Sequence, residues 1–236
     1  MVLSAGTATA GQPPPGYPSD EIMATANHAT LGPIPLHRGF WDGDTDQGFG
    51  VDKAWNKHNI WSVDAMTKLM RSPNWEKQTN GNYALRGYAY LIDCQGGGCR
   101  VADQRELIGV HDGRSYRDWY GWPVGGLMGM RTAYCQNPGG AWACPDWVTY
   151  SILFPGTDNP YKPYAFSSTQ MSADDSSGST PPSSAASAPA TDPKDTARTQ
   201  QKLKTPEIKG LQEKIAAGKA KVKFSYTPLE QAALVH

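Results

Sequence analysis

The stretch Tyr83–His111, YALRGYAYLIDCQGGGCRVADQRELIGVH, decides the fold because it holds two β-prone runs around a glycine-rich loop. The first run, Tyr83–Asp93, is rich in tyrosine, leucine and isoleucine, and the second extends from Arg100 to His111. Two such runs separated by a short glycine-containing segment are typical of a β-hairpin. Cys94 and Cys99 flank the loop, so a disulfide between them would clamp the neck of the hairpin.

A second cysteine pair, Cys135 and Cys144, brackets another turn-rich segment, between strands predicted at residues 127–136 and 146–154. An even number of cysteines at short spacings favours two disulfides and an oxidising compartment. A four-thiolate zinc site, whose usual signal is paired cysteines two residues apart, is one alternative, and free thiols are another. Because each pair brackets one predicted hairpin loop, the strand and disulfide predictions support each other.

Two helices are predicted before these strands. In the segment Gly48–Ile60, GFGVDKAWNKHNI, apolar residues and His58 recur with the spacing of one helix face. A second helix begins after Ser62, a good N-cap residue, and ends before Pro73. We therefore predict an α+β fold in which N-terminal helices precede a four-stranded antiparallel meander sheet, with a long aromatic loop at residues 112–123.

The composition divides the chain into four segments. Residues 1–36 form a proline-rich extended arm that begins like the end of a signal peptide, and residues 37–166 form the α+β core. Residues 167–191 are a disordered linker of serine, alanine and proline, and residues 192–236 are a basic tail with a short amphipathic helix near residues 206–218.

The overall charge gives no sign of a strong electrostatic field, because 22 basic residues are balanced by 22 acidic residues. A nucleic acid would therefore have to be held by a local cluster of cations. No apolar run approaches the roughly 18 residues of a membrane-spanning helix. Together with the cysteine pattern, this predicts a secreted or extracellular monomer without a membrane span.

Histidines are the main candidates for chemistry, because the chain contains none of the usual phosphate-loop, dinucleotide, metalloprotease or serine-elbow motifs. His58 stands near the end of a short helix, where the helix dipole also favours a cation for structural reasons. His111 ends a predicted strand. Each is a candidate acid or base, and each has a plain structural interpretation as well. No metal or cofactor is expected.

Thr132 and Tyr134 lie two residues apart on a predicted strand, so their side chains point to one face while Arg131 points to the other if the strand is regular. The pair can reflect β-propensity alone. It can also place a hydroxyl and a phenol opposite the helix that carries His58.

These features together resemble a known family. A histidine after GxGxxK and a second lysine, two N-terminal helices, a four-stranded meander and a late TAY triplet are similar to the metal-independent ribonuclease toxins of the barnase–EndoU–colicin–RelE superfamily. The likeness spans about Gly48 to Phe154. It implies that His58 is the general acid or base, that Lys53 or Lys57 holds phosphate, and that Thr132 and Tyr134 line the scissile bond.

The chemistry fits this resemblance. Cleavage of RNA needs a group of near-neutral pKa to take the 2′-hydroxyl proton and a cation to stabilise the phosphorane. In the aromatic loop, further residues offer base stacking and backbone contacts: Arg114, Arg117, Trp119 and Trp122.

Two other functions remain open at the level of sequence. The aromatic loop Tyr116–Trp122 is also suited to a secreted module that binds carbohydrate or a cell surface. Alternatively, the basic tail at residues 192–236 docks the protein into an assembly or onto an inhibitor. The first alternative predicts that substitution of Trp119 or Trp122 abolishes binding, and the second that removal of the tail abolishes function.

Overall fold

The computed structural model describes residues 13–140, 142–155 and 193–229. The fold is α+β, with antiparallel sheets and two disulfides, as the sequence predicts. The predicted linker at residues 167–191 and the signal-like residues 1–12 lie outside the described residues.

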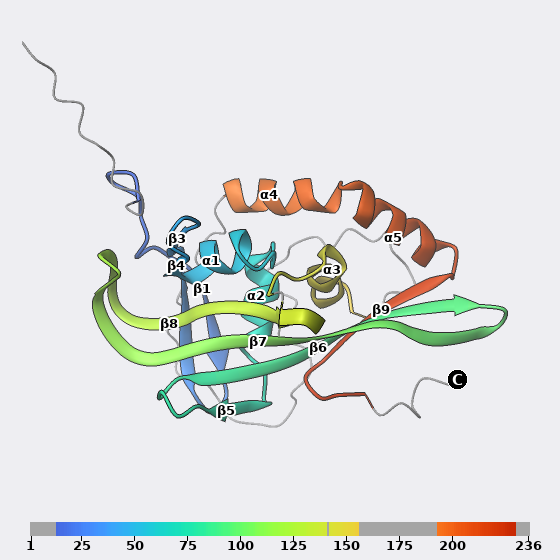
Figure 1. Cartoon of the computed structure of the whole chain (residues 1–236), viewed down its shortest axis with the longest axis horizontal. Coiled ribbons are helices and arrows are strands. Elements are labelled where there is room, and N and C mark those ends of the chain that lie inside the picture. Colours follow the sequence, from blue (N-terminus) through green and yellow to red (C-terminus); the bar gives the residue numbers. More distant parts are fainter. Residues whose placement is uncertain (1–12, 141, 156–192, 230–236) are drawn as a thin grey trace, which may run out of the picture.

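The central sheet has the strand order β5-β6-β7-β8, with β9 also paired to β6. Its members are β5 (Trp75–Lys77), β6 (Tyr83–Gln95), β7 (Gly98–Trp119), β8 (Trp122–Gln136) and β9 (Ala220–Ser225). The long strands β6, β7 and β8 run side by side through the molecule (Figure 1). The predicted hairpin is therefore β6–β7, with Cys94 opposite Cys99 at its neck.

The predicted aromatic loop at residues 112–123 is mostly strand. β7 continues to Trp119, and β8 begins at Trp122 after a two-residue turn. The turn residues Tyr120 and Gly121 have φ angles of 54° and 82°, the positive values that a tight hairpin turn of this hand requires. The sequence predicts a loop here because the stretch is rich in polar residues. The stretch is polar because the end of this hairpin is partly exposed to solvent.

The predicted fourth strand at residues 146–154 is wrong, because this segment forms helix α3 (Asp146–Leu153). Nearly every residue of α3 is buried, so its sequence shows no helical periodicity. Its β-branched and aromatic residues are also typical of a strand, which explains the wrong prediction. The sheet is consequently not a four-stranded meander, and β5 and β9 pair with β6 instead.

The prediction that helices come first is also wrong. Two hairpins precede them, β1 (Ile22–His28) with β2 (Gly32–His37), and β3 (Phe40–Asp42) with β4 (Gln47–Phe49). Pro33 and Pro35 lie in β2, which belongs to a two-stranded sheet and so has a free edge that needs no N–H donors. The arm predicted as merely extended thus folds into a hairpin.

The two expected helices follow as α1 (Gly50–Asn56) and α2 (Val63–Leu69). The Ser62 hydroxyl accepts a hydrogen bond from the amide of Ala65 at 3.3 Å, which confirms its role as the N-cap. α2 packs closely on the sheet, since a Cβ added to Gly109 of β7 would lie 2.6 Å from the sulfur of Met70.

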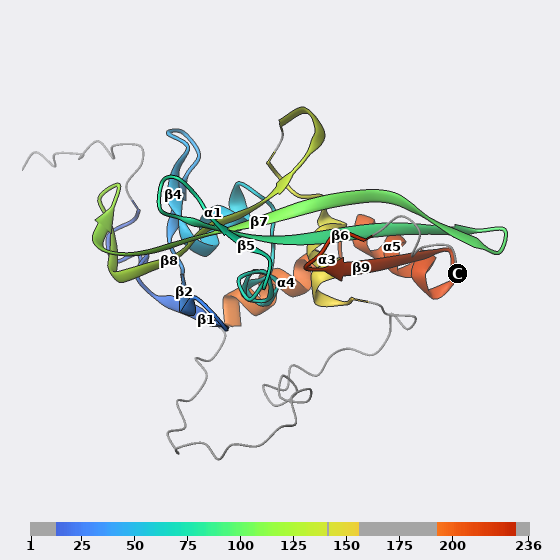
Figure 2. The ribbon, with the colours of Figure 1, turned by 90° about the horizontal axis from the view of Figure 1, so that it is seen from below.

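The C-terminal part contains α4 (Pro193–Leu203), α5 (Pro206–Ala216) and β9. The amphipathic helix expected near residues 206–218 is α5, which buries Ile208, Leu211 and Ile215. Figure 2 shows β9 beside β6, with α5 directly before it. This part of the predicted tail therefore completes the central sheet.

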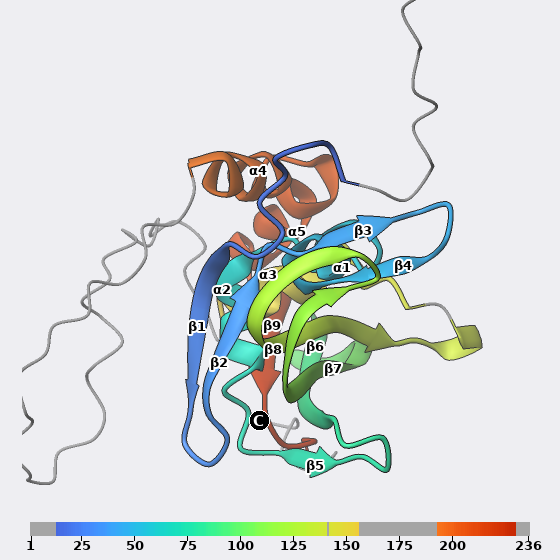
Figure 3. The same cartoon turned by 90° about the vertical axis from the view of Figure 1, so that its left-hand side faces the viewer.

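The helices stack in two layers on one side of the sheet, with α1, α2 and α3 next to the strands and α4 and α5 outside them (Figure 3). The main core lies between the sheet and the inner helices and includes Leu69, Leu107, Ala133 and Val148. A smaller cluster of Phe49, Trp122, Val124 and Met128 fills the end of the β7–β8 hairpin. Among the described residues, no helix has the length and apolar character needed to cross a membrane.

Candidate active site

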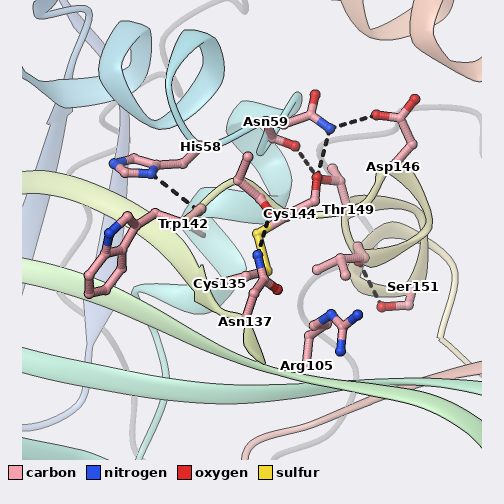
Figure 4. The surroundings of a disulfide bond; sticks show 12 residues. His58, Asn59, Arg105, Cys135, Asn137, Trp142, Cys144, Asp146, Thr149 and Ser151 are labelled. Carbon is pink, nitrogen blue, oxygen red and sulfur yellow. Dashed lines mark hydrogen bonds between the residues drawn. A yellow bond between two sulfur atoms is a disulfide. The ribbon is translucent and has the colours of Figure 1, made fainter. Parts of the chain in front are cut away.

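His58 lies just beyond the last turn of α1. The helix begins at Gly50, where a φ of 76° and a backbone oxygen only 2.5 Å from an added Cβ require glycine. Asn59 then takes a φ of 55°, a left-handed conformation that asparagine tolerates. Its amide donates to the carbonyl of Cys144 at 2.8 Å and to the carboxylate of Asp146 at 2.7 Å, which fixes the chain on the C-terminal side of His58 (Figure 4).

The imidazole of His58 is oriented by a backbone carbonyl. Its Nδ1 lies 3.2 Å from the carbonyl oxygen of Trp142 (Figure 4). Because a carbonyl only accepts hydrogen bonds, the hydrogen belongs to Nδ1, and the neutral ring keeps its lone pair on Nε2. The ring centroid lies 5.6 Å from that of Tyr134. This tautomer suits a group that takes a proton through Nε2.

The surroundings of His58 disfavour its charged form. Burial has the largest effect, the ammonium groups of Lys57 and Lys53 add to it, and the pKa falls to about 4 against an ordinary value of 6.5. The imidazole is therefore neutral at physiological pH, and in the free protein its pKa lies below the near-neutral value that suits a general base. A phosphate bound to the nearby lysines would offset their charge and raise this pKa, which would strengthen the base when substrate is present.

Thr132 and Tyr134 both lie on β8, opposite Val110 and Ile108 of β7. Burial raises the pKa of the Tyr134 phenol, which therefore stays protonated and can donate a hydrogen bond. The Thr132 hydroxyl oxygen is buried, and no described residue is its hydrogen-bond partner. An unpaired buried hydroxyl destabilises the fold by about 1–3 kcal/mol, so its presence beside Tyr134 is consistent with a role in binding.

Arg131 does not follow the regular alternation of β8. Val110 pairs with Thr132 and the next residue, His111, pairs with Met130, so Arg131 is the extra residue of a β-bulge. A bulge redirects side chains from their regular positions. The guanidinium of Arg131 lies 4.4 Å from the ring centroid of Trp119. The expectation that Arg131 points away depended on a regular strand, and the strand is irregular at that residue.

Two cations, Lys53 and Lys57, lie close enough to His58 to lower its pKa, and a third, Arg131, lies near Lys53. The Lys53 ammonium donates to the carbonyl of Gly48 at 3.3 Å, and its pKa is lowered, first by burial and then by repulsion from Lys57, with a smaller effect of Arg131. Lys57 is paired with Asp46 at 2.5 Å. Of the three, Lys53 is thus a half-buried cation with two like charges close by. A bound anion would relieve this repulsion.

His111, the other candidate of the sequence, lies in different surroundings. Its ring stacks on Tyr83 with centroids 5.6 Å apart, and its Nδ1 donates to the carbonyl of Gly129 at 3.1 Å. Burial lowers its pKa as well. These contacts bind β7 to its neighbouring strands, and none of them is shared with His58.

The remaining predicted binding residues are dispersed. Arg114 is held by the buried carboxylate of Asp112 at 2.8 Å, and Arg117 is exposed on β7. Trp119 lies under Arg131, whereas Trp122 is only 1% exposed and belongs to the small core cluster. Trp122 therefore offers no surface for stacking a ligand, which also weakens the aromatic loop as a carbohydrate site.

Two contributors were missed by sequence reasoning. The sequence predicts only a turn around Trp142, yet its carbonyl orients His58 and its indole meets Tyr134 edge to face, with ring centroids 4.9 Å apart. The one available signal was its place inside the Cys135–Cys144 loop. The β-bulge at Arg131 has no sequence signal, so the regular alternation expected for this strand does not hold at that residue.

Within the described ranges, no three histidine, cysteine, aspartate or glutamate side chains are grouped so that they could hold a metal ion. Comparisons with known proteins found no matching family model, no matching curated protein and no matching solved structure.

Proposed function

We propose that this protein is a secreted ribonuclease-like toxin or effector that cleaves RNA by acid–base transesterification without a metal ion. The observation that carries the proposal is the contact of His58 with Tyr134 beside the cations Lys53 and Lys57. The toxin or effector role rests on the resemblance of the GFGVDKAWNKH segment to the ribonuclease toxins. The two disulfides support an oxidising compartment.

In the proposed reaction, Nε2 of His58 takes the proton of the ribose 2′-hydroxyl, and the 2′-oxygen attacks the adjacent phosphorus. Lys53 and Arg131 stabilise the charge that develops on the phosphoryl oxygens, and the Tyr134 phenol donates to one of them. Lys53, made more acidic by burial and by its neighbours, supplies the proton to the departing 5′-oxygen. The products are a 2′,3′-cyclic phosphate and a 5′-hydroxyl end.

The test is incubation of the purified, oxidised full chain with mixed RNA in EDTA, beside a His58→Ala variant whose thermal unfolding matches the parent. We expect the parent to produce cyclic phosphate ends and the variant to lose about 10²–10⁴-fold in rate, the usual contribution of a general base. Intact RNA with the parent, or equal cleavage by both proteins, would refute the proposal.

A further inference from the structure

Trp142 is an exposed aromatic residue beside the candidate base. About half of its surface is open to solvent, 49%, although it is one of the largest apolar side chains. Its T-shaped contact with Tyr134 covers only part of the indole. An exposed tryptophan next to a reactive group calls for an explanation, because burial of such a ring would stabilise the fold.

The backbone around Trp142 is held at three consecutive residues. The Trp142 carbonyl accepts from the Cys135 amide at 3.4 Å as well as from His58. The Ala143 carbonyl accepts from the side-chain amide of Asn137 at 2.6 Å, and the Cys144 amide donates to the His58 carbonyl at 2.8 Å. The Cys135–Cys144 disulfide closes the same loop. The backbone that carries the indole is therefore held in place at residues 142–144, and a ligand that stacks on the ring loses little entropy in ordering these residues.

We propose that Trp142 is a stacking platform for a nucleobase next to the phosphate at His58, so that the substrate is single-stranded RNA. This inference rests on the proposed function and specifies its substrate. Stacking on aromatic rings beside a cationic backbone site is the usual means of binding single strands. Lys53 and Arg131 supply the cations here. In a duplex the bases are already paired and stacked and do not reach the ring.

Binding is measured with the full-length, oxidised His58→Ala protein, which holds RNA without cleaving it, and a fluorescein-labelled ten-nucleotide unstructured RNA. The same strand annealed to its complement serves as the duplex probe, and anisotropy gives both affinities. We expect tighter binding of the single strand. Adding Trp142→Ala to this His58→Ala protein should weaken its affinity for the single strand about 5- to 150-fold, the loss that corresponds to removal of one base–aromatic stack.

Two further variants sharpen the test. Trp142→Phe keeps an aromatic face and should recover most of the affinity. Tyr120→Ala removes an equally exposed ring, 53% open, at the tip of the β7–β8 hairpin, and should leave the affinity unchanged. Thermal unfolding and intact mass confirm that each variant is folded with both disulfides formed.

The inference is overturned if Trp142→Ala binds the single strand as tightly as its parent, if Trp142→Phe is as weak as Trp142→Ala, if the duplex binds more tightly, or if the loss follows Tyr120 instead. Its failure is distinguishable from that of the proposed function. If RNA binding depends on Trp142 but the unmodified protein, with His58 intact, does not cleave RNA, only the proposed ribonuclease activity is refuted. Cleavage without any effect of Trp142 refutes only the platform.

Discussion

His58 and His111 are alike in their own bonding and differ in their neighbours. Both are buried, both donate from Nδ1 to a backbone carbonyl, and burial lowers both pKa values. His111 stacks flat on Tyr83 between strands of the sheet. His58 instead meets Tyr134 among cations and beside a half-exposed indole. Burial and hydrogen bonding alone therefore do not distinguish a candidate catalytic histidine from a structural one. The neighbouring cations and the half-exposed indole are what single out His58.

The largest expected effect separates the two histidines directly. His58→Gln should lower the rate of RNA cleavage about 10²–10⁴-fold, because glutamine cannot take a proton. His111→Gln should lower stability by about 1–2 kcal/mol through the lost ring stack and hydrogen bond, and the rate per folded molecule should stay unchanged. Cleavage rates and urea unfolding of both variants check this. Equal loss of rate in the two variants would contradict the comparison.

The second largest expected effect is a contribution of the neutral His58 side chain to the pH dependence of protein stability. Its folded pKa of about 4 lies below the ordinary 6.5, so between these values the unfolded chain binds more protons and stability falls as the pH is lowered. The difference between the two pKa values corresponds to about 3 kcal/mol in the free energy of unfolding. This contribution is fully present above pH 6.5 and is lost by about pH 4.

Urea unfolding at pH 7 and pH 4.5 measures this contribution. His58→Gln should lose much less stability than the parent over this interval, because only the histidine contribution is removed and the carboxylates titrate in both proteins. Parallel curves for parent and variant would show that the fold does not hold His58 in its neutral form.

The two disulfides give a third comparison. The loops they close span 5 and 9 residues, so loop closure predicts a similar loss of about 2–3 kcal/mol when either is removed. Only the Cys135–Cys144 loop holds Trp142 against His58. A Cys135→Ser, Cys144→Ser double variant should therefore also lose about tenfold in cleavage rate, which corresponds to about 1.4 kcal/mol.

The matched control is the Cys94→Ser, Cys99→Ser double variant, which opens the far hairpin. Its cleavage rate at a temperature where both variants are fully folded should equal that of the parent. A larger loss of rate in this control than in the Cys135–Cys144 variant would mean that the loop does not position His58.

The smallest expected effect concerns Arg131. Arg131→Lys keeps the charge but loses the planar contact with Trp119, which is 4.4 Å away, and should raise KM about threefold with kcat little changed. Arg131→Ala should lower kcat as well, since the cation opposite the phosphoryl oxygens is removed. Steady-state kinetics on a short RNA check both. An unchanged KM and kcat in Arg131→Ala would exclude Arg131 from the site.

Local features were predicted well because their causes are local. The glycine-rich loop between Cys94 and Cys99, the Ser62 cap and the amphipathic helix at residues 206–216 each depend on neighbours a few residues apart. Helix α3 was missed because a segment buried on all sides loses the periodicity that distinguishes a helix from a strand.

The sequence by itself determined the α+β class and the candidacy of His58, and it favoured the two disulfide-closed loops over a zinc site or free thiols, since turn residues, cysteine spacing and periodic apolar residues act over short distances. Only the tertiary structure decided which histidine meets Tyr134 and where the bulge redirects Arg131. It also brought Trp142 to His58 across 84 residues of chain. Such contacts follow from how whole strands and helices pack, and no local pattern encodes them.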